Sequence, residues 1–311
     1  MAHIPFEPTI AGAQAPPPYE CTGVKAFGFP LLADARPLRY LCNQFLSIDP
    51  PSAGISFEPI TLAPYTDTCS VTLEALDYQS LTATTPPWSD LGGASQHELL
   101  FAVPVVRKQN GDPIEVGIFI PYIFVDNPGS AFAGREVLGL PKLLANIILD
   151  RNFPVSGPIE LRFDTPQTAT APAQSNEIVT ITATSDMTVS TDAFDMFLGP
   201  LDTFVDSPYY TLILAQAAGP TVGFSTRILI QPGSSTADAF SSIMRSTYTP
   251  TAVRDSGTLA PVNVTLSSIV GLDIQSTLGI TPGPDGMIPS FNPFFLDFDF
   301  DLGGLTTVWQ S

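Results

Sequence analysis

The stretch ELLFAVPVVRKQNGDPIEVGIFIPYIFV, residues 98–125, contains two apolar segments joined by a short polar turn. Residues 98–107 and 113–125 are apolar at nearly every position, which is typical of strands covered on both faces. Between them, Asn110-Gly111 matches a type I′ turn, because both residues tolerate positive φ. The stretch therefore predicts a buried β-hairpin and indicates a mainly β fold.

Segments on both sides of the hairpin extend this pattern. Runs rich in β-forming residues predict further strands at 70–78, 159–165, 177–185, 209–217 and 223–231. Apolar residues at helical spacing predict short helices at 33–46 and 237–246, and Pro141 in a first turn predicts a third helix from Lys142 to about Leu149. We expect a mainly β protein with a few short helices. Residues 1–20 would form an N-terminal arm, and residues 21–311 a single domain.

The chain is strongly acidic, which excludes several classes of partner. Its 311 residues include 30 Asp and Glu against 12 Lys and Arg, for a net charge of -18. Such a charge repels nucleic acids and anionic membranes. The first residues show no basic region followed by an apolar one, and no apolar run approaches the roughly 18 residues of a membrane helix. We therefore expect a cytoplasmic protein.

Histidine and cysteine, the usual ligands of zinc, are scarce. The chain has only two histidines and three widely spaced cysteines, which fits neither a zinc site nor a disulfide framework. In FFLDFDFDL (294–302), the carboxylates of Asp297, Asp299 and Asp301 could hold a hard cation, but their spacing fits no known ion loop. We interpret this segment as a strand with phenylalanines facing inward and aspartates outward, and we expect no metal.

Lys142 lies in the apolar stretch AGREVLGLPKLLANI, residues 133–147. Two interpretations are open. A lysine at the start of a helix can lay its stem on apolar surface while its ammonium reaches water, and composition alone favours this. Alternatively, burial among apolar residues disfavours the charged form and supplies the neutral amine that attacks a carbonyl to form a Schiff base.

The segments GRE (134–136) and GLPK (139–142) resemble the active-site motif of the acetoacetate decarboxylase family. Upstream, Glu98, residues 102–105 and residues 126–128 occur in the family's order and spacing. The resemblance favours the second interpretation of the lysine.

The resemblance implies roles for four residues. Lys142 would be the Schiff-base nucleophile, and Glu98 would relay protons and orient the substrate. Arg135 and Glu136 would support the site, with Arg135 facing an anionic substrate; alternatively, they form an ion pair that only holds the loop. The resemblance further implies a β-barrel or cone-like fold, a homo-oligomer, no cofactor, and a lyase that decarboxylates a small-molecule keto acid or acts on a ketone.

Two positions depart from the family pattern. Leu143 stands where the decarboxylases have a second lysine, and no arginine lies near Val24, where they have one close to the substrate carboxylate. These departures leave alternatives open. The protein could be an aldolase-dehydratase or cyclase of the same superfamily, a non-catalytic ligand-binding homologue, or a structural β domain whose lysine reaches bulk solvent.

Overall fold

The computed structural model describes residues 15–46, 54–62, 67–153, 157–165, 174–183, 220–230, 238–269 and 271–310. The strands are β1 (Tyr19–Asp34), β2 (Ile55–Pro59), β3 (Thr68–Ala83), β4 (Ala94–Gln109), β5 (Asp112–Val125), β6 (Lys142–Leu144), β7 (Asn146–Ile148), β8 (Ile159–Thr165), β9 (Gln174–Ala183), β10 (Thr221–Ile230), β11 (Asp238–Thr258), β12 (Val262–Leu266), β13 (Ile288–Pro289), β14 (Phe294–Leu302) and β15 (Thr306–Gln310). The helices are α1 (Ala35–Leu41), the π-helix η1 (Cys42–Leu46), the 3₁₀ helix η3 (Trp88–Leu91), α2 (Pro128–Glu136) and α5 (Ile274–Leu278). Within those ranges, no helix combines the length and apolar character that crossing a membrane requires.

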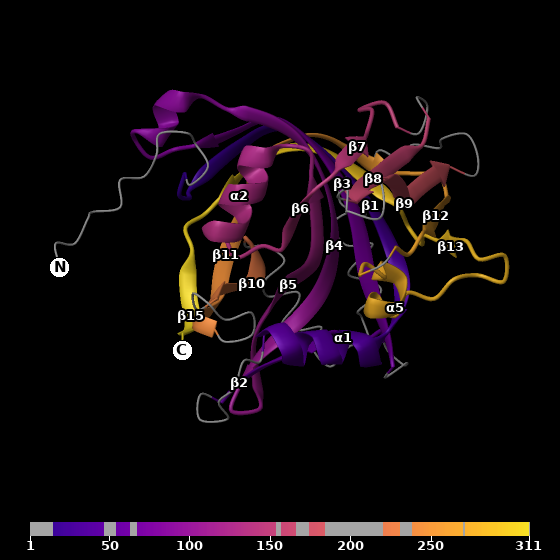
Figure 1. Cartoon of the computed structure of the whole chain (residues 1–311), viewed down its shortest axis with the longest axis horizontal. Helices are drawn as coiled ribbons and strands as arrows, with labels where there is room; N and C mark the ends of the chain where they lie inside the picture. The colour runs from indigo at the N-terminus through magenta and orange to yellow at the C-terminus, as the bar shows by residue number, and fades with distance from the viewer. Residues whose placement is uncertain are drawn as a thin grey trace.

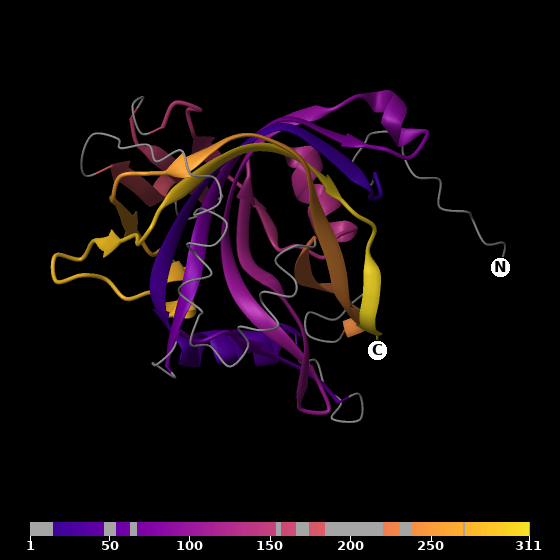
Figure 2. The same ribbon diagram turned by 180° about the vertical axis from the view of Figure 1, so that it is seen from behind.

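The larger sheet closes on itself into a barrel. Its strands follow the order β4-β3-β1-β14-β11-β10-β5, and β5 pairs with β4 to complete a ring of seven. All the pairs in this ring are antiparallel except β10 with β5. Figure 2 shows β11 and β14 running side by side along one wall of the ring. A closed ring leaves these strands no free edges, and it confirms the expected mainly β, barrel-type fold.

A second sheet, in the order β13-β12-β9-β8-β7, packs beside the barrel. It lies near β1 and β3, while α1 covers one end of the barrel (Figure 1). Alternate residues of the barrel strands face this sheet and the helices, forming a core that includes Phe29, Leu73 and Phe101 with Leu161 and Val179. The residues between them face the inside of the ring, so each wall strand has two distinct faces.

The hairpin of residues 98–125 is confirmed. Strands β4 and β5 pair from Glu98–Val125 to Gln109–Asp112, and Asn110 and Gly111 have φ of 53° and 90°. The strands predicted at 70–78, 159–165, 177–185 and 223–231 are present as β3, β8, β9 and β10, and α1 with η1 matches the helix at 33–46. The strand predicted at 209–217 and most of the predicted arm, residues 1–14, lie outside the described residues.

Two helix predictions were wrong. Of the residues predicted as a helix at 237–246, the described ones, 238–246, form the start of β11, because pairing with β10 on one side and β15 on the other outweighs a weak local preference. Residues 142–149 contain β6 and β7, not a helix. The proline that starts a helix here is Pro128, with Asn127 as its N-cap. The resulting α2 ends at Glu136, and Gly139 at φ 67° redirects the chain into an extended segment.

Candidate active site

A cavity of about 290 Å³ lies inside the ring. Residues from all seven ring strands line it, together with α2, the segment after α2, and β6. Most of the lining side chains are apolar. The polar ones among the lining residues are Tyr19, Cys21, Glu74, Tyr78, Glu98, Ser130, Lys142, Thr221 and Tyr248.

Lys142 and Glu98 meet inside this cavity. Nζ of Lys142 lies 2.9 Å from Oε2 of Glu98 and 3.0 Å from Oγ of Ser130. Lys142 and Glu98 are both only 5% exposed, which is as buried as many of the apolar core residues. Charged groups at this depth are stable only when paired and hydrogen-bonded. The interpretation as a purely structural β domain required the amine of Lys142 to reach bulk solvent. In the structure it does not.

Strand register explains why these two residues meet. Lys142 pairs in parallel with Ile123 of β5, and Ile123 pairs with Leu100 of β4. Glu98 lies two residues before Leu100, and residues two apart on a strand share a face. Burial falls along β6, from buried Lys142 through half-buried Leu143 to exposed Leu144.

Helix α2 closes the cavity over the lysine stem. The Asn127 side chain accepts a hydrogen bond from the backbone N–H of Ser130 at 3.1 Å, which fixes the first turn and places the Ser130 hydroxyl at Nζ. One helical turn further on, a Cβ added to Gly134 would lie 2.4 Å from Cδ of Lys142. Only glycine lets the helix backbone approach the lysine this closely, which explains the first glycine of the motif.

The Glu98 carboxylate has further donors. The Tyr78 hydroxyl donates to Oε1 at 3.3 Å, and Nε2 of Gln96 donates to Oε2 at 3.2 Å. With Lys142, three groups therefore hold this carboxylate. Burial raises the pKa of Tyr78 well above its usual value, with the Glu98 charge adding to the effect, so the hydroxyl stays a donor. The network holds one carboxylate oxygen at the amine.

Glu74 is a second carboxyl in the cavity, and sequence reasoning missed it. Burial, and secondarily the nearby Glu98 charge, raise its pKa from 4.5 to about 7. Glu74 of β3 pairs with Leu100 of β4, and Glu98 lies two residues before Leu100. Glu74 and Glu98 are therefore diagonal neighbours on one face of the two strands. The sequence contained a signal that could have identified Glu74. In the strand predicted at 70–78, side chains alternate between the two faces, so Glu74 shares a face with Leu76 and Tyr78. A carboxylate on an otherwise apolar face of a strand is a candidate site residue.

The other two predicted site residues lie elsewhere. Arg135 and Glu136 are both exposed on the last turn of α2, and neither lines the cavity. Arg135 borders a separate groove with Gly139, Pro141 and Thr226. The described residues include no ion pair between Arg135 and Glu136. Their supporting roles stay predictions, and the structure brings together only Lys142 and Glu98 of the four.

The position after the lysine does not face the cavity. Leu143 packs against the core between the barrel and the second sheet, on the opposite side of β6 from Lys142. A lysine at this position would follow the same alternation and point away from the amine. The departure at Leu143 therefore bears little on the cavity of this protein.

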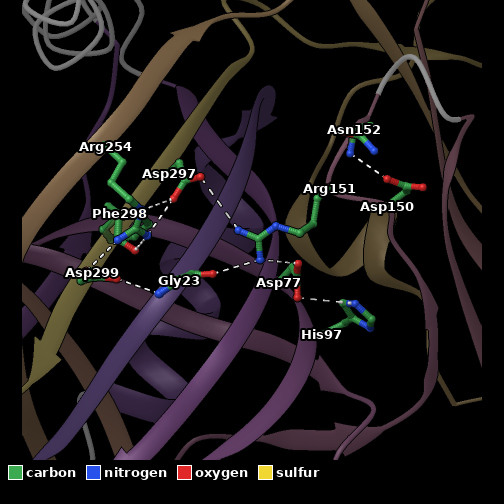
Figure 3. Close-up of polar contacts among 10 residues, drawn as sticks. All are labelled: Gly23, Asp77, His97, Asp150, Arg151, Asn152, Arg254, Asp297, Phe298 and Asp299. Carbon is green, nitrogen blue, oxygen red and sulfur yellow. Dashed lines mark hydrogen bonds and ion pairs between the residues drawn. The ribbon is translucent and has the colours of Figure 1, made fainter.

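No arginine lines the cavity among the described residues. Arg151 and Arg254 are on the outer face of the ring, where they bind carboxylates (Figure 3). Arg151 contacts Asp77 at 2.8 Å and Asp297 at 3.9 Å, so it ties the segment after β7 to the barrel wall. Asp297 also pairs with Arg254 at 2.7 Å. Nearby, His97 lies 3.7 Å from Asp77 and 2.8 Å from Asp126.

Strand β14 has the alternation that its sequence predicted. Leu296, Phe298, Phe300 and Leu302 line the cavity, while the aspartates between them face outward, two of them toward arginines. In the part of the chain that the structure describes, no three His, Cys, Asp or Glu residues are placed to share a metal ion.

The acetoacetate decarboxylase family model matches residues 66–220, a range that contains Glu74, Glu98 and Lys142. No curated protein sequence gives a match. Among solved structures, acetoacetate decarboxylase from Legionella pneumophila superposes with a TM-score of 0.59 at 16% identity, over 95% of this chain and 88% of that one. An acetoacetate decarboxylase-like enzyme from Sphingomonas wittichii gives 0.54 at 15% identity, over 99% of each chain.

The enduracididine biosynthesis enzyme MppR, with bound buffer, gives a TM-score of 0.54 at 12% identity, over 95% of this chain and 89% of that one. At these identities the solved structures show that the fold is shared, and a shared fold does not establish a shared activity. The family model and the shared barrel agree with the motif at residues 134–142. The chain belongs to the acetoacetate decarboxylase-like superfamily.

Proposed function

We propose that this protein is a Schiff-base-forming carbon–carbon lyase whose nucleophile is Lys142. The observation that carries the proposal is the 2.9 Å contact between Nζ of Lys142 and Glu98 inside the cavity. An amine must lose its proton before it can attack a carbonyl. Glu98 would accept that proton, since its carboxylate lies within hydrogen-bonding distance of the amine.

The reaction would proceed through an iminium. The neutral amine adds to the substrate carbonyl to give a carbinolamine, which loses water as Glu98 returns a proton to the leaving hydroxyl. The iminium carries a positive charge next to the Glu98 carboxylate, which stabilises it. Ser130 and Tyr78 would orient the reacting groups, since one contacts Nζ and the other contacts the carboxylate.

Decarboxylation of a keto acid is the reaction that the resemblance implies. In a β-keto acid, the electrons of the bond to the carboxylate move into the iminium and carbon dioxide leaves. The enamine that remains takes a proton at carbon, and water then hydrolyses the new iminium to release a ketone and free Lys142. The homo-oligomeric state implied by the resemblance belongs to the same proposal.

A second candidate is aldol-type chemistry on the same lysine, and the lack of an arginine among the described cavity residues favours it. Here the iminium loses a proton from the neighbouring carbon rather than carbon dioxide. The resulting enamine adds to a second carbonyl, or the reverse reaction cleaves the bond. Both reactions share the amine and the enamine. They differ in the group that the iminium loses, carbon dioxide or a proton, and in what the enamine then takes up, a proton or a second carbonyl.

Reductive trapping tests the shared step. The protein is incubated with carbonyl compounds and sodium borohydride, and the modified residue is located by peptide mass spectrometry. We expect the mass of the reduced adduct on Lys142 and no such adduct in Lys142→Ala. Binding of the same compounds without any adduct would instead identify a non-catalytic ligand-binding homologue, and it would overturn the lyase.

A further inference from the structure

We propose that the cavity takes an uncharged, apolar aldehyde or ketone in preference to a substrate that bears a carboxylate. This inference rests on the proposed function for its chemistry and favours the aldol-type reaction. It concerns the class of ligand, however, so binding alone can test it without any Schiff base. Three properties of the cavity carry it: its charge, the position of Glu74, and its apolar far wall.

The cavity offers no net positive charge to an anion. Lys142 and Glu98 form a pair whose total charge is zero whether or not the proton has passed between them. Burial raises the pKa of Tyr19 and of Tyr248 to about 12, and it raises the pKa of Tyr78 and Cys21 as well. These four groups are therefore neutral at physiological pH.

The remaining titratable group of the lining is Glu74, so the described cavity has a net charge of zero or minus one. A bound carboxylate would add a further negative charge to a cavity whose lining is mostly apolar. Buried charges are stable when they are paired. Among the described lining residues the cation is Lys142, and it is already paired with Glu98. An uncharged carbonyl avoids this, because the iminium that it forms is neutralised by Glu98.

Glu74 sets the preference against anions. It lies on the lining between β1 and β4, two residues from Leu76 and diagonally across from Glu98. With its pKa raised to about 7 by burial, Glu74 is a neutral hydrogen-bond donor in mildly acidic solution and a carboxylate in mildly alkaline solution. A keto acid would be repelled most strongly above that pKa. An uncharged ketone would not be.

The far wall of the cavity provides an apolar surface. Phe298 and Phe300 of β14 stack with ring centroids 5.4 Å apart, and Phe300 lies 6.2 Å from Tyr78, which contacts Glu98. Apolar side chains thus continue from the amine to β14. A cavity of roughly 150 Å³ can hold benzene, and this one is about 290 Å³. It has room for an aromatic ring with a short chain that ends in the carbonyl.

A matched pair of probes tests the inference. 4-Phenyl-2-butanone and 4-phenyl-2-oxobutanoate differ only in a methyl group against a carboxylate on the carbonyl carbon. Trapping of each at Lys142 with borohydride is divided by its trapping on a free lysine derivative, which corrects for the more reactive keto acid. We expect the ketone to be favoured roughly tenfold or more near neutral pH, the ratio that one pKa unit of charge interaction represents.

Variants locate the cause of the preference. Glu74→Gln removes the titrating group, so the rise in the ketone preference from about pH 6 to about pH 8 should vanish. Glu20→Gln is the control, because Glu20 is exposed on β1 between two lining residues and faces away from the cavity. It should keep the rise. Thermal unfolding confirms that both variants are folded.

Calorimetric binding of 4-phenyl-2-butanol and 4-phenylbutanoate to the wild-type protein separates the two proposals. Tighter binding of the alcohol, with no adduct at Lys142 from either carbonyl, supports the ligand class and overturns the lyase. Equal or tighter binding of the carboxylate, or a corrected preference for the keto acid, overturns the ligand class and leaves the lyase standing. If neither compound binds, the ligand class is also overturned.

Discussion

Nζ of Lys142 lies 2.9 Å from Oε2 of Glu98, although the two residues are 44 positions apart in the chain. The contact joins β6 to β4 across β5 and lies inside a ring of strands. Breaking a buried pair by removing one partner leaves the other charge unpaired. The chemistry proposed for this site and the stability of the barrel therefore depend on the same contact.

The first prediction concerns that contact. Lys142→Met should lower the free energy of unfolding by about 3 kcal/mol at neutral pH, because Glu98 keeps only Tyr78 and Gln96 as donors. The double variant Lys142→Met/Glu98→Gln should recover part of this loss. Urea denaturation measures both. A double variant no more stable than the single one would show that the charge on Glu98 is not the cause.

Gly134→Ala should impair the lysine without removing it. The new Cβ would lie 2.4 Å from Cδ of Lys142, so the side chain or α2 must shift. A displacement of about 1 Å can slow a reaction roughly 100-fold, and we expect borohydride trapping to slow by at least about tenfold. Gly304→Ala is the control, since its Cβ would enter open space. Equal trapping rates in the two variants would contradict the close approach of α2.

Leu143→Lys should not bring an ammonium to the amine. The side chain faces the core beside the second sheet, so the variant should lose about 2 kcal/mol of stability from burying a cation. The trapping rate at Lys142 should stay within about twofold of wild type. Leu144→Lys, at a position 53% exposed, should be stable. A large change in trapping for Leu143→Lys alone would place that residue at the cavity.

Glu74 should make the protein less stable as the pH rises through the acidic range. Its pKa is 4.5 when unfolded and about 7 when folded, so between these values the folded state binds the proton that the unfolded state has released. Stability therefore falls from about pH 4.5 to about pH 7 and levels off above it. The total loss is about 3 kcal/mol, at about 1.4 kcal/mol for each pKa unit.

Denaturant unfolding of wild type and Glu74→Gln across this range isolates the effect of that residue. The difference in unfolding free energy between them should change by about the same 3 kcal/mol, with wild type losing stability toward high pH. A difference that does not vary with pH would mean that the Glu74 carboxyl titrates normally.

Arg151→Met should weaken the attachment of the second sheet to the barrel. The guanidinium contacts Asp77, whose side chain is only 13% exposed, and it also contacts the carbonyl oxygen of Gly23 (Figure 3). We expect a loss of about 2 kcal/mol in the free energy of unfolding. Arg36→Met is the matched control, because the Arg36 side chain is 77% exposed and exposed ion pairs contribute little to stability. Calorimetry that finds equal melting temperatures would assign no structural role to Arg151.

Much of the site and fold could be predicted from local patterns. The hairpin followed from Asn110-Gly111 between apolar segments, and the alternation of β14 followed from phenylalanines and aspartates that succeed one another. Both depend on backbone conformation and on the period of a strand, which neighbouring residues determine. The buried lysine was predicted only through the resemblance of residues 134–142 to the family motif, because composition alone favoured an ammonium that reaches water.

Other features depended on contacts between distant segments. Lys142 lies on a strand because β5 pairs with it, although Pro141 locally favoured a helix. Glu74 faces the cavity, and Leu143 faces away from it, because strand register assigns every second residue to each side and a shift by one residue reverses the assignment. The amino-acid sequence by itself determined that a scarce cation is surrounded by apolar residues and that the chain is mainly β. Only the tertiary structure decided which carboxylates the lysine meets, because closing the ring brings β3, β4 and β6 to one cavity.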